Sequence, residues 1–331
     1  MRRPTAGCEV PELLSRVARK REIYAGDPYY RDTWDDLAAL PGGRPAAVEG
    51  LHAVAPLVLR PDAIAARGGA GLLAAVRAAG FVPVAWSGFR FDRHTTREVW
   101  RYQLNIATRE RIDVMDLIMP AGESLYVLLR DTRRAGIPAT TRLSAMKGPS
   151  RPEDREAHHL RRIAGPGQAS VLTYVHVSDE PADIVRELGI FFDGPERTRL
   201  LGALDARQDV TEQVLAALAE TESRSEASDL CWRSALDRLD GLLTGRPDAA
   251  EASALLRRVR SGGSRDWRSL LALADRLGVA WGHWDRVAVA AELSSRHLEA
   301  EPVIPDVGRS AWRPAGAPPA PADRGPASLP A

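Results

Sequence analysis

One segment decides the fold of this chain, and it runs Val171-Leu-Thr-Tyr-Val-His-Val-Ser-Asp-Glu-Pro-Ala-Asp-Ile-Val-Arg-Glu-Leu-Gly-Ile-Phe-Phe192. The β-branched run 171–175 predicts a buried strand, and the residues after it predict a helix. Ser178 or Asp179 is expected to cap this helix, which should stop at Gly189. His176 then lies between a strand and a helix N-terminus, where free N–H groups and the helix dipole favour a phosphate.

Strand and helix signals alternate from residue 54 to residue 192. Apolar runs predict strands at 54–59, 82–91, 125–129 and 171–175, and helical periodicity predicts helices at 71–79, 92–104, 109–119 and 131–146. The resulting β-α-β-β-α-β order, with extra helices, is typical of an α+β fold. We therefore expect a ferredoxin-like sandwich whose four-stranded antiparallel sheet has one face under helices.

An N-terminal arm, residues 1–53, precedes this domain and concentrates aromatic residues in a polar segment. Tyr24, Tyr29, Tyr30 and Trp34 lie close together in it. Aromatic side chains in such a setting either pack on their own domain or bind a protein partner. The sequence leaves both interpretations open.

The rest of the chain is predicted to be helical and then irregular. Apolar stripes at helical spacing include Trp232, Trp267 and Trp281, which favours a small helical bundle with tryptophans in its core. From Glu301 the chain is rich in Pro and Ala, which is typical of a disordered tail. The expected division is an N-terminal arm (1–53), the ferredoxin-like domain (54–193), a helical bundle (194–300) and the tail (301–331).

The composition excludes several classes of protein. With 331 residues, 27% charged residues and a net charge of +1, the chain has no excess charge that would attract nucleic acid or an anionic membrane. No apolar run suits a membrane span or a signal peptide. Cys8 and Cys231 are too few for a disulfide framework or a zinc site, so we expect a cytoplasmic protein. Nearly all basic residues are arginines, and Lys20 and Lys147 are the only lysines.

The motifs of the middle domain resemble those of nucleoside diphosphate kinases over about residues 54–193. Leu59-Arg-Pro-Asp62 stands where the family has Lys-Pro-Asp, and Arg67-Gly-Gly-Ala-Gly71 is similar to the family's Arg-Gly-x-x-Gly entry to a helix. The similarity is strongest at His176-Val-Ser-Asp179, with Glu187 at the family's interval and Gly189-Ile-Phe-Phe192 closing the segment.

This resemblance implies a phosphotransferase in which His176 is phosphorylated by a nucleoside triphosphate. A neutral imidazole nitrogen can attack a γ-phosphoryl group if the other ring nitrogen donates to a fixed acceptor. Glu187 can fold back along the helix to be that acceptor, and Ser178 belongs to the same catalytic motif. Without the resemblance, His176 is better interpreted as a core histidine that is hydrogen-bonded beside a helix cap.

Phosphoryl transfer needs cations that neutralise the phosphate oxygens and hold them in line. The family uses a lysine, two arginines, a tyrosine, a threonine and nucleotide-bound Mg²⁺ for this purpose. By resemblance, the nucleotide-binding residues here are Arg60, Tyr102, Ile112, Arg142, Arg161 and Thr173. Arg60 replaces the lysine, Ile112 stands where an aromatic residue stacks on the base, and Thr173 replaces an asparagine. In so Arg-rich a chain, any one arginine can instead be a solvated surface charge.

Two functions therefore remain open. In the first, the γ-phosphoryl group passes through His176 to a nucleoside diphosphate or to a non-standard acceptor, with no metal held by the protein alone. In the second, the domain is a nucleotide-binding or scaffolding module with weak turnover, which docks a protein partner through the N-terminal arm or the helical bundle. The resemblance also implies a symmetric homo-oligomer.

Overall fold

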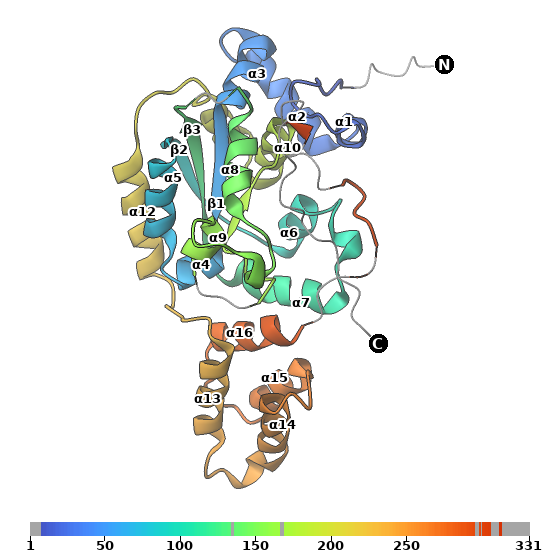
Figure 1. The fold of residues 1–331 in the computed structure, drawn as a ribbon, viewed down its shortest axis with the longest axis vertical. Coiled ribbons are helices and arrows are strands. Elements are labelled where there is room, and N and C mark those ends of the chain that lie inside the picture. The colour runs from blue at the N-terminus through green and yellow to red at the C-terminus, as the bar shows by residue number, and fades with distance from the viewer. Residues whose placement is uncertain are drawn as a thin grey trace.

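The computed structural model of the chain describes residues 8–133, 136–165, 169–294, 298, 300–305 and 311–312. Its centre is a four-stranded sheet with the order β2-β3-β1-β4, in which all neighbouring strands are antiparallel (Figure 1). The strands are β1 (Val54–Leu59), β2 (Phe81–Arg90), β3 (Glu123–Asp131) and β4 (Val175–Val177). This topology confirms the predicted ferredoxin-like, α+β fold.

Helices fill the connections between strands and extend beyond the sheet. The helices before β3 are α1 (Ala18–Tyr24), α2 (Pro28–Asp36), α3 (Gly43–Ala53), α4 (Pro61–Ala65), α5 (Gly69–Ala78), α6 (Arg93–Val99) and α7 (Arg109–Ile118). Those after β3 are α8 (Ala139–Lys147), α9 (Leu160–Ile163), α10 (Pro181–Phe191), α11 (Gly194–Leu201), α12 (Thr211–Ser223), α13 (Trp232–Leu243), α14 (Ala250–Arg260), α15 (Trp267–Arg276) and α16 (His283–Leu293). None of the helices in the described ranges has the length and apolar character needed to cross a lipid bilayer.

Two predicted helices are shorter than expected. The helix predicted over 92–104 ends at Val99. The helix predicted over 131–146 begins only at Ala139, because Pro138 disfavours helical backbone at the residue before it.

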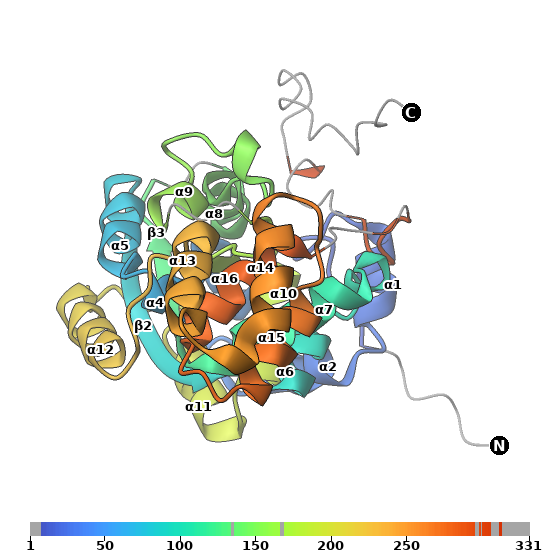
Figure 2. The ribbon, with the colours of Figure 1, turned by 90° about the horizontal axis from the view of Figure 1, so that it is seen from below.

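Both faces of the sheet are covered, whereas the sequence predicted helices on one face. All six residues of β1 are buried, although alternate side chains of a strand point to opposite faces. Helices α5 and α8 lie on one side of the sheet and α10 lies on the other (Figures 1 and 2). The additional cover comes from α10 and from α2 of the N-terminal arm, which packs on α10.

The last strand is shorter than predicted, because the chain turns sharply just before it. Tyr174 is buried in the left-handed region, with φ 60°, which a strand does not contain. Its N–H donates to the Asp62 carboxylate, and its carbonyl oxygen accepts from the Arg60 N–H. The strand therefore begins at Val175, and His176 is its central residue rather than the residue after it.

Carboxylates cap the N-terminus of α10. The N-cap is Glu180, which forms a capping box with Asp183, so neither Ser178 nor Asp179 caps the helix as predicted. Pro181 has no N–H, the Ala182 N–H donates to the Leu14 carbonyl oxygen at 2.9 Å, and the Asp183 N–H donates to Glu180, so the first N–H groups of α10 are satisfied within the protein. A phosphate therefore cannot bind at this helix terminus in the way that the sequence suggested.

Gly189 serves close packing rather than termination of α10. A Cβ atom at this position would lie 2.4 Å from the carbonyl oxygen of Tyr29 on α2. The missing side chain lets α2 and α10 approach each other, and α10 continues to Phe191.

The N-terminal arm is an integral part of the fold. Tyr24, Tyr30 and Trp34 are buried, so these aromatic side chains pack on their own chain instead of presenting a surface to a partner. The guanidinium of Arg186 on α10 is buried and donates from Nε to the carboxylate of Asp27 in the arm at 2.7 Å. Because both charges are buried, each needs the other for compensation.

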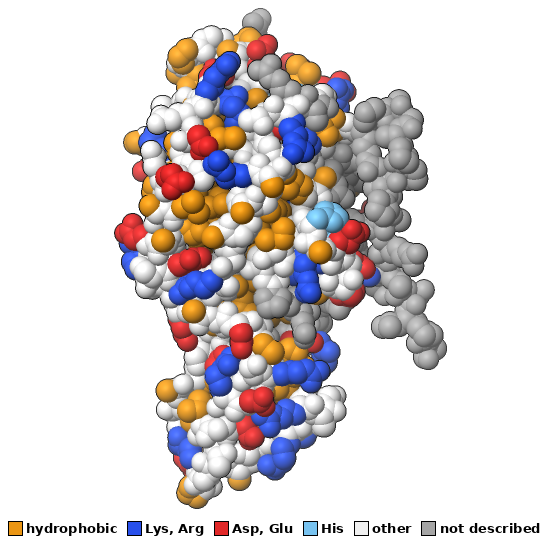
Figure 3. Space-filling model, turned by 60° about the vertical axis from the view of Figure 1, so that its left-hand side comes forward, with side chains coloured by type: hydrophobic (Ala, Val, Ile, Leu, Met, Phe, Trp, Pro, Cys, Tyr) orange, Lys and Arg blue, Asp and Glu red, His pale blue; other side chains and the backbone are white. Residues whose placement is uncertain are grey.

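The helices after α10 pack in two separate places. Helix α12 packs on β2 and α5, although the predicted bundle (194–300) included it, and α13 to α16 form a small bundle at one end of the molecule (Figures 1 and 2). Trp267, Trp281 and Trp284 are buried there, and Trp232 is half-buried. Figure 3 shows the face that carries α5 and α12, where hydrophobic side chains gather between charged ones.

Part of the predicted tail makes defined contacts. The side chain of Asn105 donates to the Glu301 carbonyl oxygen at 2.8 Å and accepts from the Val303 N–H at 3.2 Å. Further on, the Trp312 indole donates to the Glu180 carboxylate at 2.9 Å. Residues 306–310 and 313–331 of the predicted tail lie outside the described residues.

Substitution of Arg186 by Met should lower the free energy of unfolding by about 3–5 kcal/mol, because it leaves the Asp27 carboxylate buried and uncompensated. The matched control is Arg276→Gln, which removes an exposed ion pair with Glu251 and should cost under about 1 kcal/mol. Urea unfolding monitored by circular dichroism measures both. Equal losses in the two variants would show that the buried pair does not hold the arm.

Candidate active site

The pleat of the sheet directs His176 toward α10. His176 lies opposite Val58 in β1, which lies opposite Tyr126 in β3, so the three side chains share one face of the sheet. The Tyr126 ring packs against Phe191 and Phe192 at the end of α10, with ring centroids 6.2 and 5.4 Å apart. The same face therefore brings the imidazole against α10.

Glu187 of α10 binds His176 with one carboxylate oxygen and Ser178 with the other. The distance from His176 Nε2 to Glu187 Oε1 is 2.7 Å, and Ser178 Oγ donates to Glu187 Oε2 at 2.6 Å. Nδ1 of His176 has no hydrogen-bond partner among the residues that the structure describes. A carboxylate at Nε2 favours the tautomer with the proton there, which leaves the lone pair on Nδ1. The structure thus brings together all three predicted catalytic side chains.

Trp100 restricts the imidazole from another side. The two rings meet edge to face, with centroids 5.4 Å apart and an interplanar angle of 86°. The side chain of His176 is 14% exposed. Trp100 and Glu187 together limit rotation of the ring and leave part of it accessible. Trp100 lies just after α6 and was not predicted as a site residue.

A cavity of about 260 Å³ opens beside His176, and we call its charged lining residues the charged wall and its apolar lining residues the apolar wall. The charged residues that line it are Lys20, Lys147, Arg161, Asp179, Asp183 and Glu187. The apolar residues that line it are Val99, Trp100, Ile106, Pro302, Ile304 and Pro305. A ligand that reaches His176 therefore meets three cations and an apolar surface to which the C-terminal segment contributes.

Asp179 joins the charged wall to the His176 segment. Its Oδ1 accepts from Ser144 Oγ at 2.5 Å and from Lys147 Nζ at 3.0 Å. Burial alone would raise the pKa of Asp179, but Lys147, Lys20 and the Ser144 hydroxyl hold it well below its usual range. Burial likewise opposes the charge of Lys20, yet Asp183 and Glu180 keep its pKa above the ordinary lysine value.

Arg60 was predicted to bind phosphate, but its guanidinium is bound within the protein. Nε and Nη2 donate to the Asp62 carboxylate at 3.0 and 3.2 Å, and Nη2 also donates to the Val171 carbonyl oxygen at 3.3 Å. Nη1 donates to Thr173 Oγ1. Arg60, Asp62 and Thr173 are all buried, so the interaction fixes the turn before β4. Neither Arg60 nor Thr173 lines the cavity beside His176.

Two further predicted phosphate ligands do not line the cavity. Arg142 donates to the Asp131 carboxylate at 2.7 Å, at the end of the sheet opposite His176. Tyr102 donates to Asp27 at 3.0 Å and packs beside Arg186. Both side chains therefore stabilise the fold, because each is bound to a carboxylate of the protein that the sequence pattern did not indicate.

The remaining two predicted ligands have different outcomes. Ile112 is half-buried on α7 and does not line the cavity. Arg161 on α9 does line it, and its Nη1 donates to the Gly148 carbonyl oxygen at 2.7 Å. Of the six predicted nucleotide-binding residues, only Arg161 is thus beside His176.

The charged wall includes a carboxylate that could bind nucleotide-bound Mg²⁺. The described ranges contain no group of three or more His, Cys, Asp or Glu side chains suited to a metal ion. Mg²⁺ that arrives with a nucleotide takes most ligands from phosphates and water and needs only one or two carboxylates. Asp179, whose side chain is 30% exposed at the cavity, is the carboxylate that fits this need.

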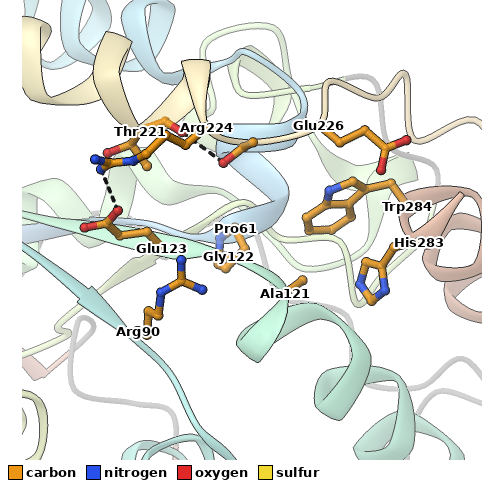
Figure 4. Close-up of a pocket in the computed structure, with 11 residues that line it drawn as sticks. Pro61, Arg90, Ala121, Gly122, Glu123, Thr221, Arg224, Glu226, His283 and Trp284 are labelled. Carbon is orange, nitrogen blue, oxygen red and sulfur yellow. Dashed lines mark hydrogen bonds and ion pairs between the residues drawn. The ribbon is translucent and has the colours of Figure 1, made fainter.

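A second, smaller cavity of about 160 Å³ lies where the sheet meets α12 and α16 (Figure 4). Arg224 from the end of α12 reaches Glu123 at the start of β3, with Nη2 2.9 Å from Oε2, and Arg90 lies nearby. His283 and Trp284 of α16 form the other side.

Acid should weaken the fold through Asp179. Because its pKa is lower in the folded protein than in the unfolded chain, the carboxylate contributes stability above about pH 4, and this contribution is lost as pH falls below that value. Asp179→Asn should therefore be less stable at pH 7 and lose less stability between pH 5 and pH 2. Urea midpoints measured across this range test the difference, and parallel curves would contradict it.

No family model matches the chain, and no curated protein matches it. Solved structures of nucleoside diphosphate kinases do match. The enzyme of Aquifex aeolicus is 21% identical, with 43% of this chain and 96% of that one covered and a TM-score of 0.35. That of Encephalitozoon cuniculi is 14% identical, with 41% and 86% covered and the same TM-score of 0.35. That of Halobacterium salinarum, solved in complex with CDP, is 19% identical, with 43% and 89% covered and a TM-score of 0.35. The likeness extends over about two fifths of this chain and concerns its fold, so what the site can do must follow from its own side chains.

Proposed function

We propose that this protein is a phosphotransferase that moves the γ-phosphoryl group of a nucleoside triphosphate through a phosphohistidine at His176. The acceptor is a nucleoside diphosphate or another molecule with a nucleophilic oxygen. The observation that carries the proposal is the hydrogen-bonded chain Ser178–Glu187–His176, which occupies Nε2 and leaves Nδ1 without a partner among the described residues.

In the first half-reaction, the Nδ1 lone pair of His176 attacks the γ-phosphorus. The N–P bond forms while the bond to the bridging β–γ oxygen breaks, and the nucleoside diphosphate leaves with that electron pair. The imidazole gains positive charge in this step, and the Glu187 carboxylate at Nε2 stabilises it. Ser178 fixes the second oxygen of Glu187, so the carboxylate does not have to reorganise during the reaction.

In the second half-reaction, a phosphate oxygen of the acceptor attacks the same phosphorus and the N–P bond breaks. The electron pair returns to Nδ1, and the imidazole is neutral again. No proton has to enter or leave the ring, because Nε2–H stays bonded to Glu187 throughout. Mg²⁺ carried by the nucleotide would neutralise phosphate oxygens, as in other phosphoryl-transfer sites.

A nucleotide-binding module with weak turnover is the second candidate. It is favoured by one observation, namely that Arg60, Tyr102 and Arg142 are bound to carboxylates of the protein. This candidate would dock a protein partner through the arm or through the helical bundle. Because the aromatic side chains Tyr24, Tyr30 and Trp34 of the arm are buried, the bundle is the better candidate for a docking surface. The two candidates differ in whether a covalent phosphoryl group forms.

Incubation with γ-labelled ATP and Mg²⁺ should give the wild-type protein an acid-labile, alkali-stable label, and His176→Ala should carry none. Addition of CDP, GDP or dTDP to the labelled protein should discharge it if a nucleoside diphosphate is the acceptor. A wild type that stays unlabelled, or His176→Ala that is labelled equally, would refute the phosphohistidine and favour the binding module.

Glu187→Gln should slow labelling by roughly ten- to hundredfold, because a neutral amide stabilises the developing imidazolium less than a carboxylate does. Nucleotide affinity, measured by calorimetry, should stay within about twofold, because the proposed role of Glu187 is to act on the imidazole. If rate and affinity fell together, Glu187 would have a structural role instead.

A further inference from the structure

Both lysines of the chain line the cavity beside His176. The other basic residues of this chain are arginines, so the general composition does not explain a lysine at either position. An ammonium group is a compact point charge with rotatable donors, whereas a guanidinium is a planar fork. The lysines at these two positions therefore indicate that an ammonium group has a specific role at this cavity.

The two lysines have different environments. Nζ of Lys20 lies 2.9 Å from both Glu180 and Asp183, and its side chain is only 6% exposed. Its charge is compensated inside the protein, where it ties the arm to the N-terminus of α10. Nζ of Lys147 donates to Asp179 at 3.0 Å, and its side chain is 17% exposed. An ammonium group has three donors, so in the described part of the chain Lys147 has donors left for an anion.

Lys147 is held close to the histidine segment and to a second cation. It is the last residue of α8, and Gly148 follows it in the left-handed region with φ 80°. The Gly148 carbonyl oxygen accepts from Arg161, which also lines the cavity. Asp179, which binds Lys147, lies three residues after His176 in the sequence. Lys147 and Arg161 thus form a pair of cations that line the cavity.

We propose that Lys147 is the cation that binds the transferred phosphoryl group, that Asp179 positions its ammonium, and that Arg161 supplies a second positive charge. The inference rests on the proposed function and assigns to Lys147 the role that the resemblance implied for Arg60. Arg60 does not fill this role, because its guanidinium is bound to Asp62, Thr173 and the Val171 carbonyl. Lysine is a common phosphate ligand, acting as a point charge.

Equilibrium binding tests this assignment independently of catalysis. Binding of inorganic tripolyphosphate and of MgADP is measured by calorimetry on the full chain carrying His176→Asn, which cannot turn over. Lys147→Gln in this background should weaken tripolyphosphate binding roughly ten- to hundredfold, the loss expected for one charge-assisted contact. Lys147→Arg should restore part of the affinity. The control is Arg162→Gln, an exposed neighbour of Arg161 that does not line the cavity and should change binding by less than about twofold.

The double variant Lys147→Gln/Asp179→Asn removes both charges of the pair, so it avoids leaving an uncompensated carboxylate if the single variant unfolds. It should bind tripolyphosphate as weakly as the single variant. If the single or the double variant stayed folded and bound tripolyphosphate as tightly as the His176→Asn protein does, Lys147 would not bind the phosphoryl group. If binding depended on Lys147 but the wild type formed no phosphohistidine, the lysine assignment would stand and the phosphotransferase proposal would fail.

Discussion

The compensation of buried charges on α10 is the constraint on which the rest of the structure depends. Glu180, Asp183, Arg186 and Glu187 are all buried on this one helix. A buried charge is strongly destabilising unless a partner compensates it. Lys20 and Asp27 of the arm bind the first three of these residues, and His176 with Ser178 binds the fourth. The arm and the sheet thus fix α10 from two directions, and the orientation of Glu187 toward His176 follows from that fixed position.

The sequence predicted the order of the strands and the group around His176 because both rest on local patterns. Apolar runs separated by helical periodicity are enough to predict a ferredoxin-like sheet, and β1 matches its prediction at both ends. Glu187 follows His176 by eleven residues on the next helix, so a short helix can bring the two together. The failures at β4 and at Gly189 have long-range causes. Tyr174 adopts its backbone conformation to bond Arg60 and Asp62, and Gly189 faces Tyr29 of the arm.

The phosphate ligands were harder to predict because a long polar side chain can bind a carboxylate of the protein instead of a ligand. Arg60 turns back to Asp62, Arg142 reaches Asp131, and Tyr102 reaches Asp27 in another part of the chain. A motif places a Cα atom, whereas the direction of a long side chain depends on its surroundings. One compositional signal for the site did exist: the chain has only Lys20 and Lys147 as lysines, and both line the cavity.

The cavity also depends on parts of the chain outside the ferredoxin-like domain. Lys20 and Tyr24 of the arm line it, and so do Pro302, Ile304 and Pro305 near the C-terminus. Backbone and side-chain hydrogen bonds from Tyr102 and Asn105 hold the C-terminal segment in place, so these apolar residues form a fixed wall. The shape of the space in front of His176 is therefore set by the packing of both chain ends. Residues 54–193 alone would keep the imidazole and Glu187 but would lose the lining residues that the arm and the C-terminal segment contribute.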